Sequence, residues 1–442
     1  MKEILDLTSF KDYLNSVKVN FLLKRYIKSI LKYFEISFHK FIFKFLQKKI
    51  IKKLKDKKKI DVYFLVSEKE KWNYQILYDL FLKSKKFFPK IVIFPNGNNN
   101  LTKKDSFLRN YSFFKNHKKL IKGVNKKYDI KNPNEIIKKG SLVFYDQPVP
   151  KLTDHWKPNK IALNHLIAYV PYGIKIANSL GELSHFGLDL HHYSWKIFCE
   201  TNWHKLKFEK YTKNYGSIIN TGHPKLDNYK IKKNYNYKKT KLKNFSKKII
   251  WAPHWTIDHY LGVEHSTFKK NYKYFLFLKK KFKAIYWFFR PHQRLERQII
   301  DTNFMKKNDL NIYFKKWNNK NSEHYNNYNY YKIFFSSDGL ITDCGSFLME
   351  YLFTGKPVLV LESGKNPGWN ELGRKVYNVY YKAYNNEDIL RFIKNVIIKK
   401  KDILKPKRER LIKFLLKDNQ SFNNNSFNSS KKIFENINNF FS

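Results

Sequence analysis

Two short segments of this sequence place cationic or imidazole side chains directly after a run typical of a buried β-strand. Residues 251–254 read WAPH, and His254 can hydrogen-bond an anion at the end of its strand, although a loop histidine without a ligand fits equally well. Residues 289–292 read FRPH. The Arg290 guanidinium offers a planar fork of donors that suits a phosphate, and His292 could donate a proton to a departing phosphate. Arg290 and His292 together predict a site for a phosphorylated ligand, in which His292 is both a catalytic and a ligand-binding residue.

A third segment, residues 340–354, predicts a strand that leads through a tight turn into a helix. The apolar strand is 340–342, the turn begins at residue 343, and the helix runs from about 347 to 354. The first N–H groups of such a helix lack partners and point out of the carboxyl edge of the sheet, where they suit a diphosphate. An ordinary strand–helix connection with a serine cap fits the same pattern.

The residues of this turn differ in what each offers a ligand. Gly345 lets a ligand approach the backbone closely, and Ser346 can cap the helix or bond a ligand oxygen. Glu350 lies on the same helical face as Ser346 and could accept hydrogen bonds from ribose hydroxyls. Asp343 would repel a diphosphate, so we expect it to orient the turn. Cys344 has no basic partner in the sequence, which makes it a poor nucleophile.

A base that activates an acceptor hydroxyl is expected on the other half of the protein, across from the phosphate site. Residues 222–227, GHPKLD, can form a turn that faces the same cleft. His165 is the first choice for the base and His155 the second, because each follows an expected strand of the first half. Further histidines in this half leave the choice open.

Short apolar runs alternate with helical segments from residue 61 onward, which predicts parallel sheets covered by helices. We expect two Rossmann-like α/β domains, at 60–230 and 249–420, joined by a basic linker at 231–248. Their cleft faces the carboxyl ends of both sheets. The expected strands are Val62–Val66, Ile91–Phe94, Leu142–Tyr145, Ile161–Leu163, Ile197–Cys199 and Ser217–Thr221 in the first domain, and Ile249–Trp251, Ala284–Phe289, Ile333–Phe335, 340–342 and Val358–Leu361 in the second.

We expect residues 1–59 to form a basic, aromatic-rich helical extension, and residues 421–442 a polar break followed by a last helix. A basic amphipathic helix can lie on an anionic membrane or can pack on the neighbouring domain with its lysines in water. No apolar run is long enough to span a bilayer, and the N-terminus lacks the layout of a signal peptide. We therefore expect a cytoplasmic protein, peripheral on the inner face of the cell membrane.

The chain carries 88 basic and 36 acidic residues, a formal charge of +52. Such an excess favours polyanionic partners, although an AT-rich genome would also raise the lysine content. Nucleic acid is an unlikely partner because no nucleic-acid-binding module is recognisable. The two cysteines lie far apart, so neither a disulfide framework nor a cysteine metal site is expected.

Taken together, five motifs resemble successive blocks of the CDP-glycerol glycerophosphotransferase family, which contains the teichoic acid primases and polymerases. They are WAPHWTID, HSTFKKNYKYF, FRPH, SDGLITDCGSFLMEYLFTGKPVLVLE and NELGRKVYNVYYKAYNNEDI. The resemblance implies a GT-B architecture and transfer of glycerol phosphate from CDP-glycerol without a metal or cofactor. It places the donor-phosphate histidine at His292, followed by Gln293 instead of proline. It places the diphosphate-binding turn at Thr342, Asp343, Cys344, Gly345 and Ser346, with Gly345 in place of a serine.

The first half departs from the family at one point. The teichoic acid polymerases carry a Trp-His-Gly-Thr loop whose histidine is the expected base, whereas residues 168–173, AYVPYG, have no histidine at the matching place. Either His165 moves the proton, or the chemistry differs. We predict transfer of glycerol phosphate, or a related alditol phosphate, to a lipid-linked or polymeric surface-glycan acceptor. The alternatives are a nucleotide-sugar glycosyltransferase of the same fold, in capsule or surface polysaccharide synthesis, and a membrane-bound scaffold whose site has decayed.

Overall fold

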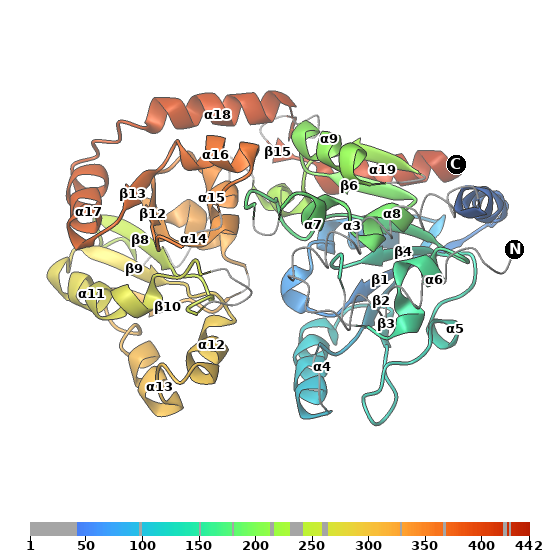
Figure 1. The fold of residues 1–442 in the computed structure, drawn as a ribbon, viewed down its shortest axis with the longest axis horizontal. Helices are drawn as coiled ribbons and strands as arrows, with labels where there is room; N and C mark the ends of the chain where they lie inside the picture. The colour runs from blue at the N-terminus through green and yellow to red at the C-terminus, as the bar shows by residue number, and fades with distance from the viewer. Residues whose placement is uncertain are drawn as a thin grey trace, which may run out of the picture.

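The computed structural model describes residues 42–96, 100–149, 152–178, 181–212, 216–229, 242–258, 264–327, 329–365, 368–418, 422–423 and 426–442. These residues form two α/β halves, each built on its own parallel sheet (Figure 1). Most of the predicted N-terminal extension and most of the predicted linker lie outside the described residues. The expected fold class, two Rossmann-like domains of GT-B type, is confirmed by the topology of the two sheets.

The first half contains a seven-stranded parallel sheet in the order β3-β2-β1-β4-β5-β6-β7. The order reverses direction between β1 and β4, the point at which open α/β sheets bind ligands. Its strands are β1 Ile60–Val66, β2 Phe87–Ile93, β3 Leu120–Lys122, β4 Leu142–Tyr145, β5 Leu166–Tyr169, β6 Lys196–Cys199 and β7 Ser217–Asn220. Its helices are η1 Lys69–Lys71, α3 Gln75–Lys83, α4 Asn100–Phe114, α5 Pro133–Ile136, η2 Asp154–Trp156, α6 Pro158–Ile161, α7 Leu183–Phe186, α8 Asp189–Tyr193, α9 Asn202–Tyr211 and η3 Pro224–Asn228.

The second half repeats this plan with six parallel strands in the order β10-β9-β8-β11-β12-β13. Its order reverses between β8 and β11. The strands are β8 Lys247–Ala252, β9 Ile285–Phe289, β10 Ser322–His324, β11 Gly339–Thr342, β12 Val358–Leu361 and β13 Tyr381–Ala383. The helices are α11 Phe268–Lys281, α12 Leu295–Asp301, α13 Lys307–Lys315, α14 Tyr331–Ser336, α15 Gly345–Leu352, α16 Glu371–Tyr377, α17 Asn386–Arg391, the π-helix η4 Phe392–Ile398 and α18 Lys405–Asp418.

Two of the expected strands are wrong. Ile161 is the last residue of helix α6, which begins with Pro158 at its first turn, residues 162–163 form the turn that follows, and the strand of this region is β5, a few residues later. Residues 333–335 lie in helix α14, whose apolar face packs against the neighbouring sheet. In both places a run of three apolar residues was too short to distinguish a strand from a buried turn of helix.

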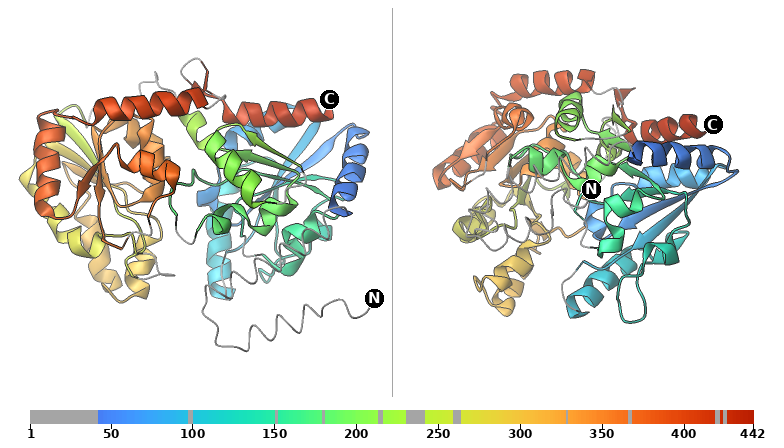
Figure 2. Two further views of the ribbon diagram at one scale, coloured as in Figure 1. Left: turned by 45° about the horizontal axis from the view of Figure 1, so that its top comes forward. Right: turned by 45° about the vertical axis from the view of Figure 1, so that its right-hand side comes forward.

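The C-terminal helix packs against the first half. Helix α18 runs along the second half toward the first, and after the short hairpin of β14 Phe422–Asn423 and β15 Ser426–Phe427 the last helix, α19 Ser429–Phe441, lies against the first half (Figure 2). Ile433, Ile437 and Phe441 are buried in the core of the first half. The carboxylate of Asp227 accepts the backbone N–H groups of Ser429 and Ser430, each at 2.7 Å, and so caps α19.

The part of the N-terminal extension that the structure describes is a helix over residues 42–55. Phe43, Ile50 and Leu54 are buried against the first half, which is the packing expected of one face of an amphipathic helix. Its lysines are exposed, as are Ile42 (48%) and Phe45 (61%). No helix among the described residues is long and apolar enough to cross a membrane.

Candidate functional site

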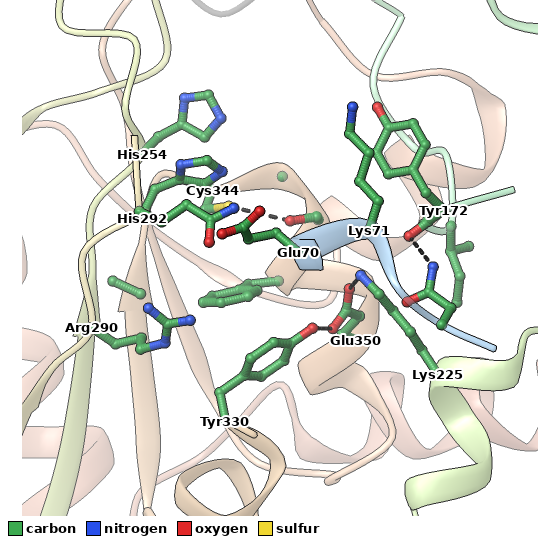
Figure 3. A pocket seen from close by; sticks show the side chains of 18 of the residues that line it. Glu70, Lys71, Tyr172, Lys225, His254, Arg290, His292, Tyr330, Cys344 and Glu350 are labelled. Carbon is green, nitrogen blue, oxygen red and sulfur yellow. Dashed lines mark hydrogen bonds and ion pairs between the residues drawn. The ribbon is translucent and has the colours of Figure 1, made fainter. Parts of the chain in front are cut away.

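A cavity of about 560 Å³ lies between the two halves (Figure 3). Loops that follow β1, β5 and β7 form its first wall, and loops that follow β8, β9 and β11 form its second wall. Both walls are therefore carboxyl ends of parallel strands, and β1, β8 and β11 border the points where the strand order reverses. This is where α/β folds of this type bind nucleotides.

His254 and His292 line the second wall, after β8 and β9 respectively. Nδ1 of His254 accepts the backbone N–H of Thr256 at 3.3 Å, and Nδ1 of His292 accepts that of Arg294 at 3.2 Å. Burial lowers the pKa of both rings, that of His292 to about 3, so both are neutral at physiological pH. Nδ1 of His254 also lies 2.9 Å from the Thr256 hydroxyl, which can donate to it. With Nδ1 as the acceptor in each ring, the tautomer that fits these contacts carries its proton on Nε2, and each ring offers one N–H donor.

Arg290 lies on the same wall, at the end of β9. Its guanidinium stands 5.7 Å from the centroid of the Tyr330 ring and donates to the carbonyl of Pro291 at 3.2 Å. Its Nε is buried and bonds to nothing among the described residues, and no carboxylate there pairs with it. Burial lowers its pKa without removing the charge. A half-buried guanidinium with no carboxylate partner and an unbonded Nε is a strong site for an anion.

Thr342 and Asp343 support this wall from beneath rather than line it. The Thr342 hydroxyl donates to the carbonyl of Ala252 at 2.6 Å and so joins the ends of β11 and β8. Asp343 accepts the backbone N–H of His254 through one oxygen, and the N–H and hydroxyl of Thr267 through the other, at 2.6 and 2.8 Å. The structure thus places Thr342 and Asp343 where they orient the turn, and neither reaches the cavity.

Cys344, Gly345 and Ser346 line the cavity at the start of helix α15. Ser346 is exposed, while the Cys344 thiol is buried, lies 3.3 Å from the Ser346 hydroxyl, and has its pKa raised by burial to about 11. The thiol is therefore not a nucleophile at neutral pH. A β-carbon on Gly345 would lie 3.1 Å from the Trp369 ring, so only glycine fits here without displacing the indole.

Glu350 lies deeper in the cavity, with 1% of its side chain exposed. One of its oxygens accepts Lys225 Nζ at 3.1 Å, and the other accepts the Tyr330 hydroxyl. Because Lys225 belongs to η3 of the first half, this contact joins the two walls. Each carboxylate oxygen keeps a second lone pair for a ligand hydroxyl.

The structure does not bring His165 to the cavity. It precedes β5 instead of following a strand, so it lies at the amino end of the sheet, where Lys57, Lys139 and burial lower its pKa to about 4. His155 lies in η2, with an exposed side chain, and does not line the cavity. His165 therefore does not follow a strand as expected; His155 does follow β4, but neither residue lines the cavity.

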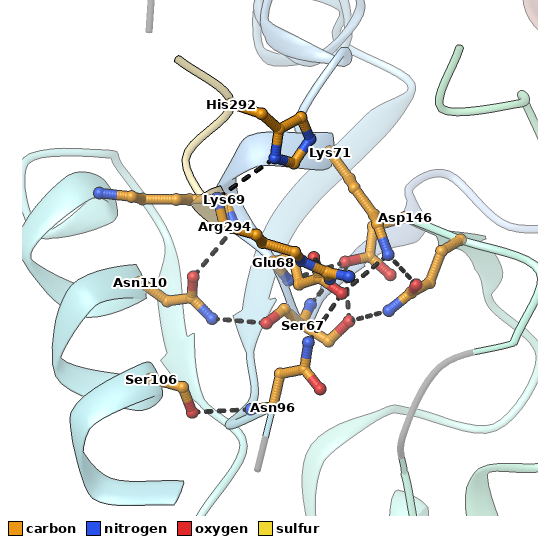
Figure 4. A network of polar contacts seen from close by, with 11 residues as sticks. Ser67, Glu68, Lys69, Lys71, Asn96, Ser106, Asn110, Asp146, His292 and Arg294 are labelled. Carbon is orange, nitrogen blue, oxygen red and sulfur yellow. Dashed lines mark hydrogen bonds and ion pairs between the residues drawn. The ribbon is translucent and has the colours of Figure 1, made fainter. Parts of the chain in front are cut away.

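Sequence reasoning missed most of the first wall. The loop after β1 is held by Asp146, whose Oδ2 accepts the backbone N–H and hydroxyl of Ser67 and the N–H of Glu68, at 2.7 to 3.0 Å (Figure 4). Burial raises the pKa of Asp146 to about 6. Glu68 pairs with Lys71 at 2.8 Å and, across the cleft, with Arg294 at 2.7 Å. The one signal in the sequence was a polar run, SEKEKW, directly after an expected strand.

The loop after β5, with Tyr172 (Figure 3) and Lys175, completes the first wall. The sequence drew attention to residues 168–173 as the counterpart of the family's histidine loop, but not to Tyr172 or Lys175 as functional residues. Lys175 Nζ donates to the Tyr172 hydroxyl at 3.0 Å, and the Tyr172 carbonyl accepts Nδ2 of Asn73 at 2.8 Å. The positive charge of Lys175, aided by Lys71 and Lys225, lowers the pKa of Tyr172 to about 8. Among the described residues, no group of three or more histidine, cysteine or carboxylate side chains could hold a metal ion.

The fold and the cavity define a nucleotide-binding enzyme with two Rossmann-like halves. Residues 110–439 match the family model described as CDP-Glycerol:Poly(glycerophosphate) glycerophosphotransferase. The chain belongs to this family, and the expected family membership is confirmed. It is accordingly a transferase that moves glycerol phosphate from CDP-glycerol to an acceptor.

Solved structures share the fold at low sequence identity. The wall teichoic acid polymerase TagF is 13% identical with a TM-score of 0.52, over 94% of this chain and 98% of that chain. MnaA from S. aureus, solved with UDP, is 15% identical with a TM-score of 0.52, over 86% and 96%. A UDP-GlcNAc 2-epimerase from Neisseria meningitidis, bound to UDP-GlcNAc, is 13% identical with a TM-score of 0.52, over 86% and 100%. No curated protein matches the sequence.

Proposed function

We propose that this enzyme binds the diphosphate of CDP-glycerol on the second wall and transfers glycerol phosphate to a hydroxyl of a lipid-linked or polymeric surface glycan, of the teichoic acid or capsule type. The observation that carries the proposal is the guanidinium of Arg290, which has no carboxylate partner among the described residues and lies on the same wall as two neutral N–H donors, His254 and His292. The first N–H groups of helix α15 add further donors at Gly345 and Ser346.

The proposed reaction is an in-line displacement at phosphorus. The acceptor oxygen attacks the phosphorus that bears glycerol, the bond from this phosphorus to the bridging oxygen breaks, and CMP leaves with the electron pair. Arg290 and His292 stabilise the charge that develops on the leaving phosphate, since preorganised donors act most strongly on charge that grows in the transition state. Glu350 is placed to accept a ribose hydroxyl, with Lys225 and Tyr330 fixing its orientation.

A donor screen tests this function. The purified chain is titrated with CDP-glycerol, CDP-ribitol, UDP-sugars and GDP-sugars by calorimetry. The molecular mass of the product formed from each donor is then measured by mass spectrometry. Selective binding of CDP-glycerol or a related CDP-alditol, with CMP released and glycerol phosphate added to the acceptor, supports the proposal. Selective binding of a sugar nucleotide would instead indicate a glycosyltransferase of the same fold. Binding without turnover would indicate a scaffold.

We also propose that the enzyme works as a peripheral protein on the cytoplasmic face of the cell membrane. The support is the helix over residues 42–55, with exposed lysines beside exposed Phe45 and Ile42, because such a helix binds anionic headgroups through charge and apolar area together. Flotation with phosphatidylglycerol vesicles tests it. The chain should float with these vesicles, and a variant with Lys48, Lys49, Lys52 and Lys53 changed to glutamate should not. Flotation that is unaffected by the charge reversal contradicts this membrane contact.

A further inference from the structure

The proposed reaction needs a group that takes the proton of the acceptor hydroxyl, and the acceptor must approach from the wall opposite the donor phosphates. Every histidine that lines the cavity is on the second wall: His254, His265 and His292. The groups of the first wall that can accept a proton are Glu68, Glu70 and Tyr172.

Glu68 is unsuited to this role because its carboxylate is already bound. One oxygen accepts Lys71 Nζ at 2.8 Å and the amide of Asn96 at 2.7 Å, and the other pairs with Arg294 at 2.7 Å. These cations lower the pKa of Glu68 even though burial opposes them. A carboxylate that is stabilised in its charged form is a weaker base.

Tyr172 is bound in a way that stabilises the phenolate. The ammonium of Lys175 can only donate, so the Tyr172 oxygen is the acceptor of their 3.0 Å hydrogen bond. Among the described residues, Lys175 Nζ forms no ion pair with a carboxylate; it lies 4.5 Å from the centroid of the Tyr172 ring. Lys71 stands over the same ring at 5.2 Å. The Asn73 side chain holds the Tyr172 carbonyl and so fixes the loop.

We propose that Tyr172 is the general base of the transfer, acting as a phenolate held by Lys175. This inference rests on the proposed function. The phenolate oxygen takes the proton of the acceptor hydroxyl as the acceptor oxygen bonds to phosphorus and CMP departs; the phenol then returns the proton to solvent.

The charges around the phenol set its protonation. Lys175, Lys71 and Lys225 face it, and of these Lys71 is paired with Glu68 and Lys225 with Glu350. They bring the pKa of Tyr172 to about 8, so about a tenth of the enzyme carries the phenolate at pH 7. A group whose pKa lies near the working pH is an efficient general base, and a phenolate is a stronger base than carboxylates in general.

The test compares Tyr172→Phe, Lys175→Met and Glu70→Gln with the unmodified chain. The acceptor probe is a synthetic glycerol phosphate trimer on a dodecyl lipid, the donor is CDP-glycerol, and CMP release is followed from pH 5.5 to 10.

We expect the rate of the unmodified chain to rise with pH and to level off above about 8. Tyr172→Phe should lower kcat by about 10²- to 10⁴-fold, with unchanged affinity for CDP-glycerol, and should abolish the plateau. Lys175→Met should move the midpoint upward. Tyr384→Phe, on an exposed tyrosine that does not line the cavity, is the matched control.

Wild-type kcat and an unchanged pH midpoint in Tyr172→Phe would overturn the role of Tyr172. The role of Tyr172 would also be overturned if Glu70→Gln lost the pH dependence of the rate while Tyr172→Phe retained it. An unmodified chain that binds CDP-glycerol but transfers nothing contradicts the proposed function, and with it the need for a base. Failure of Tyr172→Phe alone to change the rate leaves the proposed function intact.

Discussion

The rings of His254 and His292 lie with their centroids 5.5 Å apart, at the ends of the neighbouring strands β8 and β9. Each ring accepts the backbone N–H of the residue two positions later, so each presents the same tautomer. His223 of the first half forms the same turn, and there Nε2 donates to the carbonyl of Pro171 at 2.7 Å. Since a carbonyl can only accept, His223 shows directly that this turn leaves the proton on Nε2.

Replacement of either cavity histidine should reduce the rate of transfer more than the affinity for the donor. His254→Ala and His292→Ala each remove one N–H donor, and the loss of one preorganised donor costs about 10²- to 10³-fold in kcat. His292→Gln keeps an N–H group near the position of Nε2 and should retain more activity than His292→Ala. The measurement is CMP release under saturating CDP-glycerol. Equal activity of the alanine variants and the unmodified chain would show that these rings do not contact the reacting phosphate.

Activity should also fall as the pH drops below about 6, because burial raises the pKa of Asp343 to about this value. Ionised Asp343 accepts from His254 N–H and from Thr267, and a protonated carboxyl must give up one of these contacts. The effect of Asp343 on stability has the opposite sign. Because its pKa is higher in the folded than in the unfolded protein, its protonation stabilises the folded state. This contribution is complete below about pH 4 and is lost as the pH rises through 6. In Asp343→Asn the activity should be low and show no inflection near 6 in kcat/KM against pH. An inflection that survives in this variant would assign it to another group.

Within the part of the chain that the structure describes, two ion pairs cross the cleft, and their removal should have different effects. Lys225→Ala leaves the buried carboxylate of Glu350 with only the Tyr330 hydroxyl, which should cost about 1–3 kcal/mol of unfolding free energy. Arg294→Ala removes a half-exposed partner of Glu68 and should cost about 0–1 kcal/mol. Urea unfolding gives both values, and small-angle scattering should show a wider cleft in Lys225→Ala. An equal loss of unfolding free energy in the two variants would contradict the claim that the buried ion pair contributes more to stability than the half-exposed one.

Helix α19 should be a structural part of the first half and not a detachable tail. Ile437 is fully buried in the core of that half, so Ile437→Ala should lower the unfolding free energy by about 2–5 kcal/mol. Asn439 is exposed on the same helix, and Asn439→Ala should change it by no more than about 0.5 kcal/mol. Urea unfolding at 25 °C compares them. An Ile437→Ala variant as stable as Asn439→Ala would show that the helix contributes little.

The second wall was largely predictable from the sequence, because its residues stand next to local signals. A strand, a proline and a histidine follow one another at His254 and at His292, and Gly355, three residues after the last residue of α15, has a positive φ of 73° that favours glycine in the turn after a helix. The resemblance to the family also rests on these segments. Phosphate-binding residues that follow directly after a single strand are close together in the sequence, so short motifs can predict them.

The first wall was not predictable in the same way, because tertiary packing assembles it. Lys175 and Tyr172 have no spacing that signals a catalytic pair, and Lys71 approaches them from a loop a hundred residues earlier in the chain. His165 was chosen because residues 161–163 resembled a strand, whereas Pro158 begins a helix there and the true strand comes later. A displacement of a few residues moved the expected base from one edge of the sheet to the other.

The position of the donor diphosphate in a structure determined with CDP-glycerol is the most direct test of the central claim. The account predicts phosphate oxygens within hydrogen-bond distance of the Arg290 guanidinium, of Nε2 of His254 and His292, and of the first N–H groups of helix α15. It also predicts that the glycerol-bearing phosphorus faces Tyr172 across the cavity. A diphosphate bound instead to the lysines of the first wall, Lys71 and Lys175, would contradict it.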